Sequence, residues 1–241
     1  MAFHSSSVDG LSWPKLTAGI LLQRYKRFLA DVQLDSGETV TAHCPNSGSM
    51  KGCCEPGRTA YLSQSDNPKR RLRYTWEMIR MPTSLVGVNT SIPNRLVEHS
   101  LLTDRIASLQ GYPSIRREVR YGVSSRIDLL LERSNGKRCF VEVKNCTLVE
   151  EGIAYFPDAV TLRGQKHLLE LIDQVQAGHR AVTFFLVQRM DARLFMPADH
   201  IDPKYGVLLR KALEAGVEIL VYDVDINPQQ ICLRSSLPFE L

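Results

Sequence analysis

Two short apolar runs separated by a turn limit most strongly what this chain can fold into. Residues 126–132 and 138–144 are rich in Ile, Leu, Val and Phe, and the turn-forming residues 134–136 (Ser, Asn, Gly) lie between them. This pattern predicts a β-hairpin. Each run also carries charges in its interior, at Asp128, Glu142 and Lys144. Charges in strands this apolar are costly unless they are paired, hydrogen-bonded or bound to metal, so the pattern predicts a polar site within a sheet.

The length of the turn decides whether these charges can meet. Glu142 and Lys144 are two residues apart on one strand, so they point to the same face. A two-residue turn ending at Gly136 would set Asp128 opposite Val143 and turn it away from Glu142. A three-residue loop closed by Gly136 in a left-handed conformation sets Asp128 opposite Glu142 instead. A shared metal ion requires the second register, or a bulge elsewhere that corrects the first, and we predict that the two carboxylates come within roughly 4 to 6 Å of one another.

The three charged residues suit the hydrolysis of a phosphodiester. Asp128 and Glu142 offer hard oxygen ligands to Mg²⁺ or Mn²⁺, and Mg²⁺ keeps several waters and takes few protein ligands. Lys144 can orient or help deprotonate an attacking water, or offset charge that develops on the phosphoryl group. Together they resemble the core of PD-(D/E)xK nucleases. The alternative is an ordinary cross-strand ion pair on a polar strand face.

A helix predicted at about residues 160–177 adds a fourth candidate for catalysis. In a helical projection Gln165 lies on the apolar face, which is formed by Leu162, Leu168, Leu169, Ile172 and Val175. We assign Gln165 to the catalytic site, with a core-edge amide satisfied by the backbone as the alternative. Arg163 and His167 project roughly to the opposite side. The projection therefore makes His167 a poor candidate for a metal ligand or general base.

The rest of the C-terminal part predicts a mixed sheet with flanking helices. Leu102, Ile106 and Leu109 recur at helical spacing after Pro93, which predicts a helix to about Leu109. Further elements are predicted at residues 115–121 (strand), 181–188 (strand), 203–215 (helix) and 217–223 (strand). Such a succession indicates an α/β (α+β) fold. We place a PD-(D/E)xK nuclease-like domain at residues 91–241.

The N-terminal part has a different pattern, of short strand-forming runs separated by turn residues. The runs are residues 20–34, 39–44, 59–65, 72–81 and 84–88. A long connection rich in Gly, Ser and Pro, residues 45–58, follows the second run. Five strands with such a connection predict an OB-like β-barrel, which we place at residues 1–90.

Basic residues in this part predict a nucleic-acid-binding surface. One group comprises Lys69, Arg70, Arg71 and Arg73, and a second comprises Arg24, Lys26 and Arg27. Cations of this kind neutralise phosphates and release counterions, and the aromatic rings interleaved with them give bases a stacking surface. Strand alternation places Trp76 in the barrel core. No base-reading motif accompanies these groups, so we predict DNA binding that tolerates any sequence, with RNA not excluded.

Charge and cysteine usage agree with this division of the chain. The net charge is +4, and residues 1–110 hold 13 Lys and Arg against 9 Asp and Glu, whereas residues 111–241 hold 17 of each. No run is apolar enough to span a membrane, and residues 1–10 lack the apolar stretch of a secretory signal, so export is not expected. The six cysteines are expected to be reduced thiols, which predicts a cytoplasmic protein. A zinc site at His43, Cys44, Cys53 and Cys54 is a weaker alternative.

Several longer motifs resemble the sugar fermentation stimulation protein family of bacteria. They are RYKRFLA at 24–30, HCPNSGSM at 43–50, NRL at 94–96, SRID at 125–128, EVK at 142–144, FPDAVT at 156–161 and RGQKHL at 163–168. The resemblance implies an N-terminal OB-like domain, a C-terminal nuclease-like domain, and DNA binding linked to sugar utilisation. It also assigns Asp128, Glu142 and Lys144 to the nuclease-type triad.

Two hypotheses about function follow. In the first, the basic domain holds DNA and the triad hydrolyses it with Mg²⁺ or Mn²⁺. In the second, the same fold is a DNA-binding regulator of sugar metabolism without catalysis. Convergence of both carboxylates and Lys144 on one open cleft would favour the first. The sequence leaves the oligomeric state and the role of residues 46–50 open.

Overall fold

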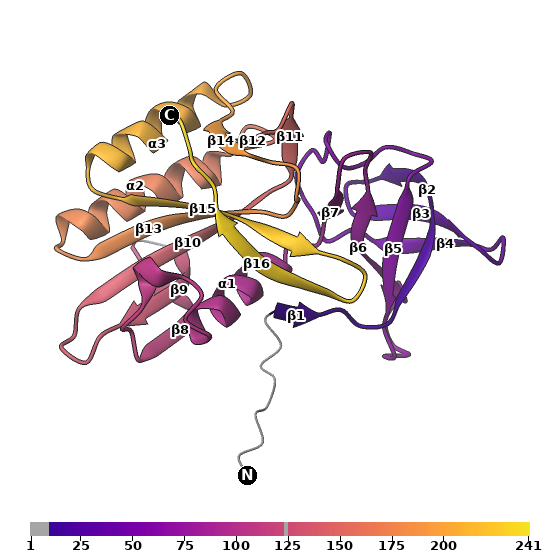
Figure 1. Cartoon of the computed structure of the whole chain (residues 1–241), viewed down its shortest axis with the longest axis horizontal. Coiled ribbons are helices and arrows are strands. Elements are labelled where there is room, and N and C mark those ends of the chain that lie inside the picture. Colours follow the sequence, from indigo (N-terminus) through magenta and orange to yellow (C-terminus); the bar gives the residue numbers. More distant parts are fainter. Residues whose placement is uncertain (1–9, 123–124) are drawn as a thin grey trace, which may run out of the picture.

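The computed structural model describes residues 10–122 and 125–241 of the chain. Within these ranges the strands form a six-stranded, a seven-stranded and a three-stranded sheet. Figure 1 shows a small β-barrel from the first part of the chain beside a larger layered structure from the rest. The protein therefore has an α+β fold with an N-terminal barrel, as the sequence predicts.

Five consecutive strands build the barrel. They are β2 (Leu16–Tyr25), β3 (Leu29–Leu34), β4 (Thr39–His43), β5 (Thr59–Gln64) and β6 (Tyr74–Arg80). They lie in the order β4-β3-β2-β5-β6, and β4 also pairs with β6, which closes the barrel. A short strand, β7 (Leu85–Gly87), extends the sheet beyond β6. The predicted OB-like barrel is confirmed.

The strands of the barrel differ from the prediction in two places. Residues 20–34, predicted as one run, form the hairpin of β2 and β3, because Lys26 and Arg27 adopt φ angles of 46° and 65° and turn the chain. The run predicted to begin at residue 72 starts two residues later, so residues 69–73 form a loop before β6. The barrel still has five strands, as predicted, because β7 is not one of the strands that close it.

The barrel encloses its own core. Trp76 is fully buried there, as predicted, and its indole Nε1 donates to the carbonyl of Met78 at 3.0 Å. A buried tryptophan requires such a partner for its N–H group. Thr75, the neighbouring residue on β6, is also buried.

The larger part of the chain is a seven-stranded mixed sheet. Its strands in spatial order are β1 (Gly10–Ser12), β16 (Gln230–Ser236), β15 (Glu218–Ile226), β13 (Arg180–Val187), β10 (Arg138–Cys146), β9 (Ser125–Glu132) and β8 (Ser114–Tyr121). The central strands β10, β13 and β15 are parallel, and antiparallel pairs flank them. The predicted hairpin of β9 and β10 thus lies inside the sheet.

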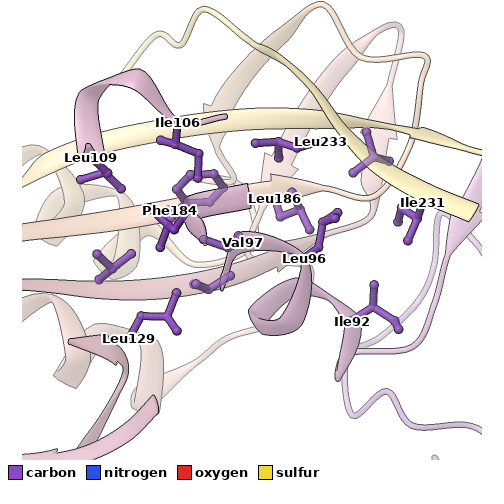
Figure 2. Close-up of a cluster of buried hydrophobic side chains, with 14 of the residues drawn as sticks. Ile92, Leu96, Val97, Ile106, Leu109, Leu129, Phe184, Leu186, Ile231 and Leu233 are labelled. Atoms are coloured by element: carbon purple, nitrogen blue, oxygen red, sulfur yellow. The ribbon is translucent and has the colours of Figure 1, made fainter. Parts of the chain in front are cut away.

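Helices cover both faces of this sheet. On one face α1 (Ile92–Leu102) buries Ile92, Leu96 and Val97 against residues of β9, β13 and β16, as Figure 2 shows. On the other face lie α2 (Leu162–Gln176) and α3 (Pro203–Glu214), which pack on a second core (Figure 1). Two apolar faces explain why strands β9 and β10 are almost continuously apolar.

Helix α1 ends earlier than predicted. It stops at Leu102, which is 67% exposed, and Asp104 follows in a left-handed conformation with φ of 55°. Ile106 and Leu109 are nevertheless buried, in and beside the short 3₁₀ helix η1 (Ala107–Leu109). The chain turns after α1 and then packs on the same core again, so the helical spacing of these residues does not come from one continuous helix.

Some elements were not predicted. A three-stranded sheet of β11 (Leu148–Glu150), β12 (Ile153–Phe156) and β14 (Leu194–Pro197) lies at the edge of the larger domain. Strand β1 pairs with β16, so residues 10–12 belong to the large sheet and not to the barrel in which the sequence placed them. The predicted boundary at residue 90 stays a prediction. No helix in the described ranges is long and apolar enough to cross a membrane.

Candidate active site

The turn between β9 and β10 sets the register that the chemistry requires. Arg133 N donates to Lys137 O at 2.9 Å, and Gly136 N donates to Arg133 O at 2.9 Å. Gly136 has a φ of 80°, the left-handed conformation predicted for a three-residue loop. Along the ladder, Val141 pairs with Leu129, so the next pair in this register is Glu142 with Asp128. The register prediction is confirmed.

Asp128 lies just beyond the last paired residues of the hairpin. Its Oδ2 accepts a hydrogen bond from Val143 N at 2.8 Å, and its Oδ1 accepts one from Asn94 Nδ2 of α1 at 2.8 Å. Burial raises the pKa of Asp128, the negative charge of Glu142 raises it further, and it reaches about 6. The two carboxylates are therefore close enough to repel one another.

Glu142 is held by two cationic or donor groups. Lys144 Nζ donates to Glu142 Oε1 at 2.8 Å, and His167 Nδ1 is hydrogen-bonded to the same oxygen. Burial opposes ionisation of Glu142, but Lys144 and His167 outweigh it, so its pKa is lowered. Its other oxygen, Oε2, is buried without a hydrogen-bond partner among the described residues. Glu142 thus keeps one carboxylate oxygen free while it stays charged.

His167 is a site residue that the helical projection missed. It is 5% exposed, and its Nε2 accepts a hydrogen bond from Arg163 Nε at 3.3 Å. With Nε2 as the acceptor, a neutral imidazole carries its proton on Nδ1 and donates it to Glu142. The projection was wrong because it counted Leu162 and Leu169 as buried, whereas they are 74% and 44% exposed. The buried face is rotated toward His167.

Gln165 is buried on α2, but its side chain turns away from these residues. Its Nε2 donates to both carboxylate oxygens of Asp202, at 2.9 and 3.0 Å. Asp202 in turn caps α3 by accepting from Tyr205 N at 3.0 Å, and it accepts from Thr161 N at the start of α2 at 2.9 Å. Gln165 is not among the residues that line the cleft described next. It ties the N-terminal ends of the two helices together.

The charged residues share one cleft. The cleft has a volume of about 400 Å³, and its lining includes Asp128, Glu142, Lys144 and His167. The first turn of α2 contributes Arg163 and Gly164. The structure therefore brings three of the four predicted catalytic residues, together with His167, to a common space.

One wall of this cleft comes from the barrel. Residues 46–48 line it, although they belong to the long connection after β4. Asp158, which belongs to the second part of the chain, accepts hydrogen bonds from Ser49 Oγ at 3.2 Å and Met50 N at 3.0 Å. A side chain at Gly48 would lie 2.6 Å from the Asp158 carboxylate, so only glycine fits this approach. The loop of unknown role is thus part of the site.

Arg24 holds this loop in place. Its guanidinium donates to the carbonyls of Asn46 at 2.8 Å, Gly48 at 3.1 Å and Ser49 at 3.3 Å. We predicted Arg24 to contact nucleic acid, but these bonds occupy its donors and leave it partly buried. The structure gives Arg24 a positioning role.

The other predicted cations remain on the surface. Lys26, Arg27, Lys69, Arg71 and Arg73 are exposed, whereas Arg70 is half-buried and donates to Thr75 Oγ1 at 2.7 Å. The two groups lie at the same end of the barrel. Phe28 directly follows the first group, and its carbonyl accepts from Cys44 N. Thr75 follows the second group, and it pairs with His43. Both contacts are at the C-terminal end of β4. The cleft-lining loop leaves β4 at this same end.

None of the six cysteines forms a disulfide. Within the described ranges no set of three or more His, Cys, Asp or Glu side chains is arranged to hold a metal ion. For a metal ion the cleft thus offers the two carboxylates of the hairpin, and water would complete the coordination.

Comparison with known proteins identifies the family. Residues 22–88 match a family model described as the SfsA N-terminal OB domain, and residues 91–230 match the Sugar fermentation stimulation protein RE domain. The chain belongs to the sugar fermentation stimulation protein family. A homolog from Geobacter sulfurreducens is 59% identical over 223 residues, which cover 92% of this chain and 95% of that one. One from Geotalea daltonii is 56% identical over 225 residues, covering 93% and 97%.

A solved structure extends the family resemblance to the whole fold. SfsA from Pyrococcus furiosus, solved in complex with Ca²⁺, is 30% identical and has a TM-score of 0.89. The match covers 98% of this chain and 100% of the archaeal chain. The two proteins therefore share the combination of barrel and large sheet.

Proposed function

We propose that this protein binds DNA and hydrolyses its phosphodiester bonds with a divalent cation such as Mg²⁺ or Mn²⁺. The observation that carries the proposal is the convergence of Asp128, Glu142 and Lys144 on one cleft. A merely structural ion pair would need no open space beside it. Phosphodiester hydrolysis needs that space for the phosphate and for water.

The donor atoms fit a divalent cation. Glu142 Oε2 is buried without a partner in the described part of the chain, and an anionic oxygen in that position lacks the compensation that burial requires. Asp128 and Glu142 would hold the ion, since each has carboxylate lone pairs left. When bound, such an ion polarises a phosphoryl oxygen and lowers the pKa of water. The Ca²⁺ bound by the Pyrococcus furiosus relative is in keeping with this assignment.

The neighbouring side chains prepare the carboxylates. Lys144 and the Nδ1–H of His167 keep Glu142 ionised, and Val143 N and Asn94 fix the orientation of Asp128. Lys144 also supplies a positive charge beside the position that a phosphate would take. Positioned charges of this kind stabilise the negative charge that develops in the transition state.

The exposed cations of the barrel would hold the DNA backbone. Lys26, Arg27, Lys69, Arg71 and Arg73 lie at the barrel end from which the cleft wall at residues 46–48 extends. Phe28, 46% exposed beside Lys26 and Arg27, offers a surface for base stacking. Contacts of these types carry no sequence information, so binding tolerates any sequence.

The second candidate is a DNA-binding regulator without catalysis. The observation in its favour is that Lys144, Glu142 and His167 already satisfy one another in part. Such a buried network can be retained for structural specificity alone. The proposals differ in whether metal binds and whether DNA is cut.

A cleavage screen over single-stranded, duplex and branched DNA and the corresponding RNAs, with Mg²⁺, Mn²⁺ or EDTA, separates them. We expect metal-dependent cleavage by the wild type and loss of at least about 100-fold in Glu142→Ala, since the variant lacks a ligand of the metal ion and the charge stabilisation that the ion supplies contributes this much. DNA affinity of Glu142→Ala should equal or exceed that of the wild type, because removal of a carboxylate relieves repulsion of phosphate. Glu214→Ala, an exposed change on α3, is the control. Cleavage that survives in Glu142→Ala would refute the enzyme hypothesis, and DNA binding without any cleavage would favour the regulator.

A further inference from the structure

Two large apolar side chains stand exposed at the rim of the cleft. Val160 is 66% exposed and lines the cleft, and Leu162, two residues later, is 74% exposed at the start of α2. Isolated exposed apolar residues are common on protein surfaces. Here the two lie two residues apart in the segment between Asp158 and Arg163, and this segment places Val160 in the lining of the cleft that holds the carboxylates.

This rim segment, residues 158–163, is fixed at both ends. Asp158 is bound by Ser49 Oγ and Met50 N of the barrel loop. Thr161 N donates to Asp202 at 2.9 Å, and Thr161 Oγ1 accepts from Gly164 N at 3.0 Å to cap α2. A backbone held in this way cannot turn Val160 and Leu162 inward. Their exposure is built into the fold.

The cations near Val160 and Leu162 indicate a partner that is anionic on its outside and apolar inside. Arg163 follows Leu162 directly, is exposed, and lines the same cleft. Across the cleft lies the barrel loop, and the exposed cations sit at that end of the barrel. DNA has this combination, because its backbone is anionic and its stacked bases are apolar on their faces. Proteins that distort DNA insert Leu, Ile, Met, Phe or Pro between base steps in the same manner.

We propose that Val160 and Leu162 form a wedge that inserts into a base step of DNA next to the phosphate held in the cleft. The inference rests on the proposed function and specifies its substrate class. A wedge favours DNA whose bases separate at little cost, such as a mismatch, a nick or the junction of a duplex with a single strand. Intact duplex is then bound more weakly, because its bases must be unstacked first.

The test uses a duplex in which 2-aminopurine, whose fluorescence rises on unstacking, replaces adenine at each position in turn. The full-length wild type, in buffer with Ca²⁺, should raise the fluorescence at any labelled position, because binding tolerates any sequence and the wedge can enter every step of the duplex. The double variant Val160→Ser/Leu162→Ser should abolish the rise and weaken binding to a nicked duplex, the kind of DNA that a wedge favours, by about tenfold, a loss typical of one or two apolar contacts at an unstacked step. Its affinity for single-stranded DNA should change less than twofold.

A matched control and a conservative variant make the outcomes distinct. Val207→Ser/Leu213→Ser removes two apolar side chains, 62% and 41% exposed, from α3 and should leave the fluorescence rise intact. Leu162→Met should also preserve it, since an apolar side chain remains. Wild-type binding without any rise would overturn the wedge alone, as would a double variant that only alters self-association in sedimentation. Absence of wild-type DNA binding would overturn the proposed function and the wedge together.

Discussion

Asp128 is the residue whose ionisation most directly reports the candidate metal site. Its pKa in the folded protein is about 6, above the ordinary value of 3.8, because it is buried beside Glu142. A raised carboxyl pKa stabilises the fold only while the group is protonated. That contribution is present below about pH 4 and is lost as the pH rises through about 6. Without metal, ionised Asp128 therefore costs stability at neutral pH.

Asp128→Asn should consequently stabilise the metal-free protein at neutral pH. The amide has nearly the same shape, can still accept from Val143 N, and can donate to a flipped Asn94. We expect a gain on the order of 2 kcal/mol at pH 7 that disappears toward pH 4. Thermal unfolding in EDTA across this range measures it, with the exposed Asp173→Asn as control.

Metal should make the wild type more stable than Asp128→Asn. Mg²⁺, Mn²⁺ or Ca²⁺ should raise the unfolding temperature of the wild type and leave that of Asp128→Asn unchanged, because binding to the native state alone stabilises it. Equal stabilisation of both proteins by metal would exclude Asp128 as a ligand.

Individual site residues were predictable where local rules decide their position. Asp128, Glu142 and Lys144 follow from strand alternation and from the geometry of a three-residue loop with Gly136, all within twenty residues of chain. His167 depends on the rotation of a helix that packs on a sheet and on α3, and two exposed leucines misled the projection. The partner of Gln165, Asp202, comes from a loop far along the chain, which helical periodicity cannot reveal.

At the scale of elements, the loop of residues 46–50 shows how the barrel completes the cleft. Arg24 donates to three of its carbonyls, and Asp158 accepts from Ser49 and Met50. Neither contact follows from the sequence, since both join segments of different elements. Prediction from sequence likewise missed the three-stranded sheet, whose short strands lack enough residues for a periodic signal.

Arg24→Ala should loosen this loop without changing the charge-driven part of DNA binding. Four hydrogen bonds from a charged donor are lost, three to the loop and one to the carbonyl of Arg27, and we expect a stability loss of about 2 kcal/mol in chemical denaturation. Metal-dependent cleavage should fall by about tenfold or more, because displaced positioning groups slow the reaction strongly. Lys26→Ala, two residues away but exposed, should keep the stability, and at saturating DNA it should keep the cleavage rate.

Salt dependence distinguishes the role of Arg24 from that of a phosphate contact. The slope of DNA affinity against salt should stay at the wild-type value in Arg24→Ala and become shallower in Lys26→Ala. A shallower slope in Arg24→Ala would show that Arg24 contacts DNA phosphates.

At the scale of the molecule, the uneven distribution of charge along the sequence corresponds to an uneven distribution of charge in space. The excess of cations lies in the first part of the chain, whereas the carboxylates of the hairpin lie in the second. The cleft joins them, because its wall comes from the barrel and its floor from the large sheet. Overall fold class and barrel were predictable from strand counts, but strand β1 crosses between the two parts to pair with β16. No local pattern in three residues could have revealed that pairing.

Arg71 and Arg73 lie exposed before β6, where DNA phosphates can reach them. Arg71→Ala/Arg73→Ala should weaken binding to DNA of every sequence by a similar factor, because phosphate contacts carry no sequence information. Each lost contact should reduce the slope of log affinity against log salt by about 1, so the double variant should lose about 2. Fluorescence anisotropy at several salt concentrations, with two unrelated duplexes, measures both effects. Lys204→Ala/Lys211→Ala removes the same charge from α3 and should leave the slope unchanged. Binding by the wild type that is insensitive to salt, or a loss confined to one duplex, would show that the barrel does not hold DNA through its phosphates.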